Sequence, residues 1–163
     1  FALHPGERVV LDGKNGSGKS SLLKVLLGES IPHSGTITTS AGLVVSYVPQ
    51  DTAHLNGLLS HFAEKHHLDE SLFKGILRKM GFERVQFEKK MEDFSAGQKK
   101  KVLLAASLCQ PAHLYVWDEP LNFVDLHTRL QITSLLRQAQ PTMLFVEHDR
   151  AFQEEIATQK ISL

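Results

Sequence analysis

The sequence of 163 residues contains one cysteine, Cys109. A lone cysteine excludes an internal disulfide, and this usage is typical of a reducing compartment, so we expect a cytoplasmic protein. No apolar run approaches the ~20 residues of a membrane-spanning helix, so no direct membrane span is expected. Eighteen basic residues balance eighteen acidic ones, and this balance gives no support for a general nucleic-acid-binding surface.

The remaining composition is ordinary for a globular protein. Apolar residues make up 42% of the chain and charged residues 22%, and this length is enough for one domain with a sizeable core. Because the chain begins only a few residues ahead of its first predicted strand, we expect residues 1–163 to be a single domain and a fragment of a longer chain.

Short β-branched or apolar runs alternate with segments of helical periodicity. This alternation predicts an α/β fold with a mostly parallel sheet covered on both faces. The expected strands are 7–12, 36–39, 43–48, 113–117, 142–146 and 161–163. The expected helices are 20–27, 70–80 with Asp69 as its N-cap, 96–109 with Ser95 as its N-cap, 125–138 and 149–157.

Residues 51–94 interrupt this pattern, because Leu, Phe, Lys, Glu and His replace the branched runs there. We expect a small helical subdomain inserted in the α/β core. In its helix, apolar residues at helical spacing predict one buried face. These residues are Leu72, Phe73, Ile76, Leu77 and Met80.

The strongest motif lies between a predicted strand and a predicted helix. Its glycines allow backbone N–H groups to curl toward an anion, and the helix N-terminus adds its positive dipole end. We therefore expect Lys19 to bridge the β- and γ-phosphates of a nucleotide and the Ser20 hydroxyl to ligate Mg²⁺. The residues that fit G-x-x-x-x-G-K-[ST], the P-loop motif, are Gly13, Lys14, Asn15, Gly16, Ser17, Gly18, Lys19 and Ser20.

A second motif closes the predicted strand 113–117. Asp118 and Glu119 follow this apolar run, which is the Walker B pattern of P-loop NTPases. The aspartate can hold the Mg²⁺ shell, and the glutamate can polarise a water for attack on the γ-phosphate. An acidic pair after a strand is a weak signal alone, but about a hundred residues after a P-loop it is a strong one.

Four further features complete a resemblance. Residues 94–98, Phe-Ser-Ala-Gly-Gln, precede the Walker B pattern and resemble the signature motif of ATP-binding-cassette (ABC) domains, usually Leu-Ser-Gly-Gly-Gln. Gln50 after a strand resembles the Q-loop glutamine, residues 120–125 occupy the D-loop position, and His148 resembles the switch histidine. The likeness covers nearly the whole chain, with its elements in the family's order.

The resemblance implies ATP hydrolysis with Mg²⁺ at an interface shared with a second cassette. Residues from Gly13 to Ser21 would hold the phosphates, and Ser20, Gln50 and Asp118 would set Mg²⁺ and its waters. Glu119 would orient or deprotonate the attacking water, and His148 would contact the γ-phosphate. The residues implied to serve the partner cassette or to form the D-loop contact are Ser95, Ala96, Gly97, Gln98 and Asp125.

The finer resemblance is to the ABC-F subfamily. The run Glu-Pro-Leu-Asn-Phe-Val-Asp at 119–125 and the lysines after the signature are similar to that subfamily's pattern, in which Glu-Pro-Thr-Asn-His-Leu-Asp is usual. The chain resembles the C-terminal cassette of the antibiotic-resistance type, which implies the ribosome as a target. Ala96 replaces the first signature glycine, and Leu121 and Phe123 depart from the usual D-loop.

Two other classes stay open at this point. One is the nucleotide-binding subunit of a membrane transporter, which would dock on a membrane partner through the helical subdomain. The other is a structural or DNA-repair ATPase of the same superfamily, although segment 51–94 is too short for the coiled coil that would mark it.

Two polar groups are better explained as solvated surface than as sites. The spacing of His54, His61, His66 and His67 matches no strong metal template. Lysines 99–101 are typical of a solvated helix face.

Overall fold

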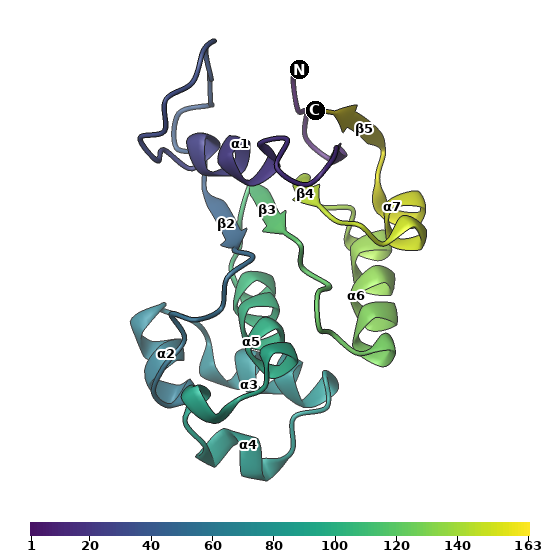
Figure 1. Ribbon diagram of the computed structural model, residues 1–163. Helices are drawn as coiled ribbons and strands as arrows, with labels where there is room; N and C mark the ends of the chain where they lie inside the picture. Colours follow the sequence, from purple (N-terminus) through teal and green to yellow (C-terminus); the bar gives the residue numbers. More distant parts are fainter.

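The computed structural model describes all 163 residues and contains one parallel sheet of five strands (Figure 1). The strand order is β2-β3-β4-β1-β5, and every neighbouring pair is parallel. The predicted α/β class with a parallel sheet is thus confirmed. The strands are β1 (Arg8–Asp12), β2 (Val45–Val48), β3 (Leu114–Asp118), β4 (Met143–Val146) and β5 (Gln159–Ser162).

Helices cover both faces of this sheet (Figure 1). Successive residues of β1 point to opposite faces, so Val9 and Leu11 pack in the apolar cluster that contains Leu23 of α1, while Val10 joins the larger cluster on the other face. The helices are α1 (Lys19–Leu26), α2 (Leu59–Lys65), α3 (Glu70–Lys79), α4 (Arg84–Glu88), α5 (Ala96–Cys109), α6 (Leu126–Ala139) and α7 (Arg150–Ile156).

Residues 51–94 hold α2, α3, α4 and the 3₁₀ turn Met91–Asp93, and no strand. Their apolar side chains are continuous with the core under the sheet, because Phe73 and Leu77 belong to the same buried cluster as Trp117. Leu72 was predicted on this buried face, but it is 50% exposed. The buried face of α3 is therefore narrower than the periodicity indicates.

Two predicted strands require correction. Residues 36–39 form no strand and are exposed, because β-branched residues stabilise a strand only where a neighbouring strand pairs with them. The last strand begins at Gln159, two residues before the prediction, and pairs in parallel with β1. No helix of the protein is long and apolar enough to cross a bilayer.

Helix starts follow the predicted caps closely. Asp69 accepts a hydrogen bond from the backbone N–H of Leu72, and Ser95 accepts one from Gln98. Such side-chain acceptors satisfy N–H groups that the first helical turn leaves without a partner. These local signals explain why the starts of α3 and α5 could be predicted to the residue.

The fully buried indole of Trp117 generates the first testable prediction. Its Nε1 donates to Ser107 Oγ over 2.9 Å. Ser107→Ala leaves this N–H without its acceptor, so we expect a loss of about 1–3 kcal/mol in the free energy of unfolding, measured by urea denaturation. Ser134→Ala, on the exposed face of α6, is the matched control. Equal stability of the two variants would contradict the prediction.

Candidate functional site

The predicted phosphate loop lies between β1 and α1. Gly16 and Gly18 have φ angles of 80° and 98°, in the left-handed region that glycine adopts without strain. These two positions curl the chain so that the N-terminus of α1 faces the loop, and Lys19 Nζ donates to the carbonyls of Gly13 and Lys14 over 2.7 and 3.0 Å. The loop thus presents helix N–H groups and a lysine to an anion.

Asp118 ends β3 beside this loop. Its side chain is buried, and Oδ1 has no hydrogen-bond partner. Burial raises the pKa of Asp118, while the hydrogen bond from Ser20 lowers it in part. A buried carboxylate oxygen without a donor, next to a hydroxyl on the first turn of α1, suits a hard divalent cation such as Mg²⁺.

Glu119 is the point where several predicted residues meet. Gln50 Nε2 donates to its Oε2 over 2.8 Å, and His148 Nε2 lies 3.3 Å from its Oε1. Asn122 Nδ2 also donates to Oε2. Glu119 itself has a φ of 47°, an uncommon conformation that costs energy outside glycine and is concentrated at functional sites.

Asn122 and Glu147 were missed by the sequence analysis. Glu147 is buried, and its carboxylate accepts hydrogen bonds from the backbone N–H groups of Leu121, His148 and Asp149 at 3.0, 2.7 and 3.3 Å. Glu147 therefore connects the D-loop segment to the segment that carries His148 through hydrogen bonds. An acidic residue directly after a buried strand was the available signal.

Ser95 and Gln98 cap α5 reciprocally. Gln98 N donates to Ser95 Oγ, and Ser95 N donates to Gln98 Oε1, which is the capping-box arrangement. A Cβ built on Gly97 would overlap the carbonyl oxygen of Phe123. Glycine at this position thus allows the start of α5 to pack directly on the D-loop backbone, whereas Ala96 is exposed.

Asp125 caps α6 through Thr128 N and forms an ion pair with Lys101 over 2.5 Å. Partial burial raises the pKa of Asp125, but the hydrogen bonds from Lys101 and Thr128 outweigh it and hold the pKa well below its usual range. Lys101 also donates to the Met80 carbonyl at the end of α3.

The interpretation of lysines 99–101 as a solvated face is wrong for two of them. Lys100 is buried and Lys101 is held by the contacts just described, because the turn of α5 directs these side chains toward the Q-loop and the D-loop. The four histidines of 51–94 are all exposed, as expected of a solvated surface.

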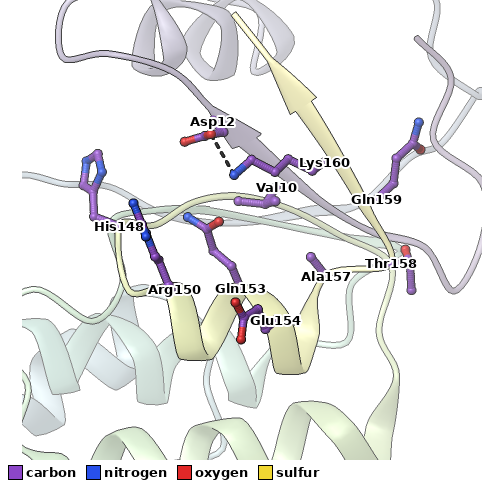
Figure 2. A pocket seen from close by; sticks show the side chains of 10 residues that line it. All are labelled: Val10, Asp12, His148, Arg150, Gln153, Glu154, Ala157, Thr158, Gln159 and Lys160. Carbon is purple, nitrogen blue, oxygen red and sulfur yellow. Dashed lines mark ion pairs between the residues drawn. The ribbon is translucent and has the colours of Figure 1, made fainter.

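A cavity of about 740 Å³ lies beside this site, between α7, β1 and β5 (Figure 2). Only His148 among the predicted site residues borders it. Asp12 and Lys160 form an ion pair across its wall. The cavity is therefore adjacent to the residues around Glu119 and distinct from the phosphate loop.

Comparison with known proteins decides the family. The family model described as ABC transporter matches residues 1–122, about three quarters of the chain. The chain belongs to the ABC transporter family. Members of this family are ATP-binding cassettes with ATPase activity, so the predicted family and fold are confirmed.

Curated relatives of this cassette include ABC-F proteins. ATP-binding protein Uup of Caulobacter vibrioides is 32% identical over 97% of the chain. Ribosome protection protein VmlR of Bacillus subtilis is 30% identical over 99% of it. The chain spans only 28% and 30% of these two relatives, so it matches less than a third of each.

Solved structures show the same fold. A cassette in the complex of an archaeal ribosomal stalk protein with a ribosome recycling factor superimposes with a TM-score of 0.81 at 27% identity, over 98% of this chain and 32% of that one. A dimeric bacterial ABC transporter cassette gives 0.82 at 20% identity, over 100% and 83%, and this second likeness concerns the fold alone.

The signature residues at the start of α5 lie apart from the phosphate loop at the start of α1. Figure 1 places α1 at one end of the molecule and the start of α5 beside the helices of segment 51–94. The residues around Glu119 lie near the ends of β3 and β4. Ser95 and Ala96 are exposed, which leaves their surface accessible to another molecule.

The contact of Gly97 generates a second prediction. Gly97→Ala forces the Phe123 carbonyl to move and so displaces the D-loop. We expect ATP turnover by the full-length protein to fall by about 10-fold or more, while binding of labelled ATP at the P-loop persists. Gly75→Ala is the matched control, because a Cβ there meets nothing within 4 Å. Equal turnover in the two variants would exclude the proposed packing constraint.

Lys19 generates a third prediction. Lys19→Ala removes the cation that we place beside the β- and γ-phosphates, and we expect ATP affinity to fall strongly in an equilibrium titration with labelled nucleotide. Lys24→Ala removes the same charge from the exposed side of the same helix and should preserve affinity. Unchanged binding by Lys19→Ala would overturn the assignment of the P-loop.

Proposed function

We propose that the chain is one cassette of a cytoplasmic ABC-F-type protein that hydrolyses ATP, acts on the ribosome and confers antibiotic resistance by ribosome protection. The observation that supports the hydrolytic part best is the convergence of Gln50, Asn122 and His148 on Glu119. The ribosomal part is supported by the likeness to ribosome protection protein VmlR and to the ribosome recycling factor.

In the proposed mechanism, residues 13–21 bind the phosphates and Lys19 balances their charge. Ser20, Asp118 and the side chain of Gln50 would hold Mg²⁺, which would neutralise charge on the phosphate oxygens. The buried oxygen of Asp118 without a donor is the feature that fits this ion. Glu119 would orient or deprotonate the attacking water, and His148 would move from Glu119 toward the γ-phosphate.

Positioning and charge stabilisation supply most of the catalysis in phosphoryl transfer. Gln50 and Asn122 share one oxygen of Glu119, and His148 approaches the other. These contacts fix the carboxylate, so that its free lone pairs can be directed at one water. The left-handed φ of Glu119 is in line with this role.

The complete site would need a second cassette. Ser95 caps α5, and both Ser95 and Ala96 are exposed. The positive dipole end of α5 suits a γ-phosphate that another cassette holds. We therefore propose that the signature residues 95–98 serve the partner's nucleotide and that Asp125 shapes the D-loop contact. The isolated chain should then be largely monomeric with little ATPase activity.

The fourth prediction tests the ribosomal part. Glu119→Gln removes the charge and basicity of the proposed base but keeps its size, so hydrolysis should fall by ~10²-fold while ATP binding persists. The closed state of the two paired cassettes should then accumulate, because ATP binding favours closure and the hydrolysis that would reopen the pair is blocked. The measurement is co-sedimentation of the full-length protein, changed at both corresponding glutamates, with ribosomes in ATP and in ADP.

We expect association in ATP and release in ADP. Asp93→Asn, which removes a charge from the exposed surface of the 3₁₀ turn, is the control and should hydrolyse ATP and leave the ribosome normally. A Glu119 variant that closes on ATP yet never associates with ribosomes would exclude the ribosomal function. That outcome would favour the nucleotide-binding subunit of a membrane transporter.

A further inference from the structure

Lys100 is the most deeply buried cation of the protein, with 1% of its surface exposed. Its Nζ donates to the carbonyl oxygens of Pro49 and Gln50 over 2.9 and 3.0 Å. The neighbouring Lys99 is only partly buried, and Lys101 points to Asp125. The three successive lysines thus have three different environments, and only Lys100 forms hydrogen bonds with the carbonyls of Pro49 and Gln50.

Burial of a lysine requires compensation, because the ammonium group loses its hydration. Here two carbonyl oxygens accept from it, and the carboxylates of Asp118, Glu119, Glu147 and Asp51 provide a favourable field. A side chain of this kind is rarely fully buried unless it is paired. The arrangement therefore depends on the Q-loop carbonyls remaining where they are.

The contact has a geometric consequence for Gln50. The same residue whose carbonyl accepts from Lys100 donates its side-chain Nε2 to Glu119. Along the chain, the planar peptide bond and the φ and ψ torsions of Gln50 are all that separate the two carbonyls. Because one ammonium group donates to both, these hydrogen bonds restrict rotation of the Gln50 backbone. A shift of Lys100 would move the Gln50 backbone and with it the amide that reaches Glu119.

We propose that Lys100 is a positioning residue for hydrolysis: its ammonium group fastens the Q-loop carbonyls to helix α5 and so holds Gln50 against Glu119. This inference rests on the roles proposed above for Gln50 and Glu119. It also ties the Q-loop to the signature, because α5 begins at the signature residues and carries Lys100 one turn further along. If a partner cassette displaced the start of α5, the side chain of Lys100 would transmit this displacement to Gln50.

The test is a double-mutant cycle in the full-length protein. Lys100→Met keeps length and volume but removes the donors, so we expect kcat to fall by about 10-fold or more and KM for ATP to change less than about twofold, because the P-loop is untouched. Lys99→Met is the matched control with unchanged kcat. Lys100→Arg, which retains N–H donors, should recover part of the loss. The residual turnover of the Glu119→Gln variant is the background rate, which is subtracted from the rate of every other variant.

Gln50→Ala completes the cycle. If Lys100 acts through Gln50, then Lys100→Met should lower kcat by less than about twofold in the Gln50→Ala background. If Lys100 had a purely structural role, the losses in kcat from Gln50→Ala and Lys100→Met would instead multiply in the double variant. Lys100→Met would then also raise KM or lower the thermal midpoint. If Lys100→Met fails to fold, Lys100→Gln, which is too short to reach both carbonyls, takes its place in the cycle.

The outcomes separate the two levels of the proposal. Losses in kcat that multiply in the double variant, and so add as activation free energies, would overturn the positioning role and leave the hydrolytic assignment intact. Normal kcat in Gln50→Ala would overturn the role assigned to Gln50, and the positioning role with it. Non-additive losses with unchanged KM and thermal midpoint, together with recovery in Lys100→Arg, would support the inference.

Discussion

The carboxylates at the ends of β3 and β4 impose the main physical constraint on this molecule. Asp118, Glu119 and Glu147 are carried to one edge of the sheet because β3 and β4 are adjacent and parallel. Carboxylates brought together away from water repel each other and lose hydration. Each therefore has its own compensation: Ser20 for Asp118, the amides of Gln50 and Asn122 for Glu119, and backbone N–H groups for Glu147.

These compensating groups come from segments far apart in the chain. The Q-loop, the D-loop and the segment after β4 are all joined to the same small group of oxygens. Movement of one segment therefore changes the partners of the others. This is the property that an ATPase needs if the state of its γ-phosphate is to be transmitted to distant surfaces, and it follows from the order of the strands.

The sequence was sufficient where the signal is local. Neighbours within a few positions determine the strand and helix on either side of the P-loop, the acidic pair at the end of β3, and the caps Asp69 and Ser95. The structure places these elements as predicted. The environment of Lys100 and the contact between Glu147 and the D-loop could not be predicted, because the partners are 50 and 26 residues apart in the sequence. The strand predicted at residues 36–39 is wrong for the same reason, since a strand depends on a neighbouring strand that no local pattern reveals.

The two glycine positions of the signature are constrained from opposite sides. At Gly97 the restriction is internal, because the D-loop carbonyl of Phe123 occupies the space that a side chain would need. At Ala96 the side chain is exposed, so the chain's own packing accepts a methyl group there. The side chain at position 96 therefore faces an approaching molecule and not the packed interior of the cassette. Sequence variation among cassettes at this position would then report on the fit between partners, whereas variation at position 97 would report on whether the D-loop has kept its path.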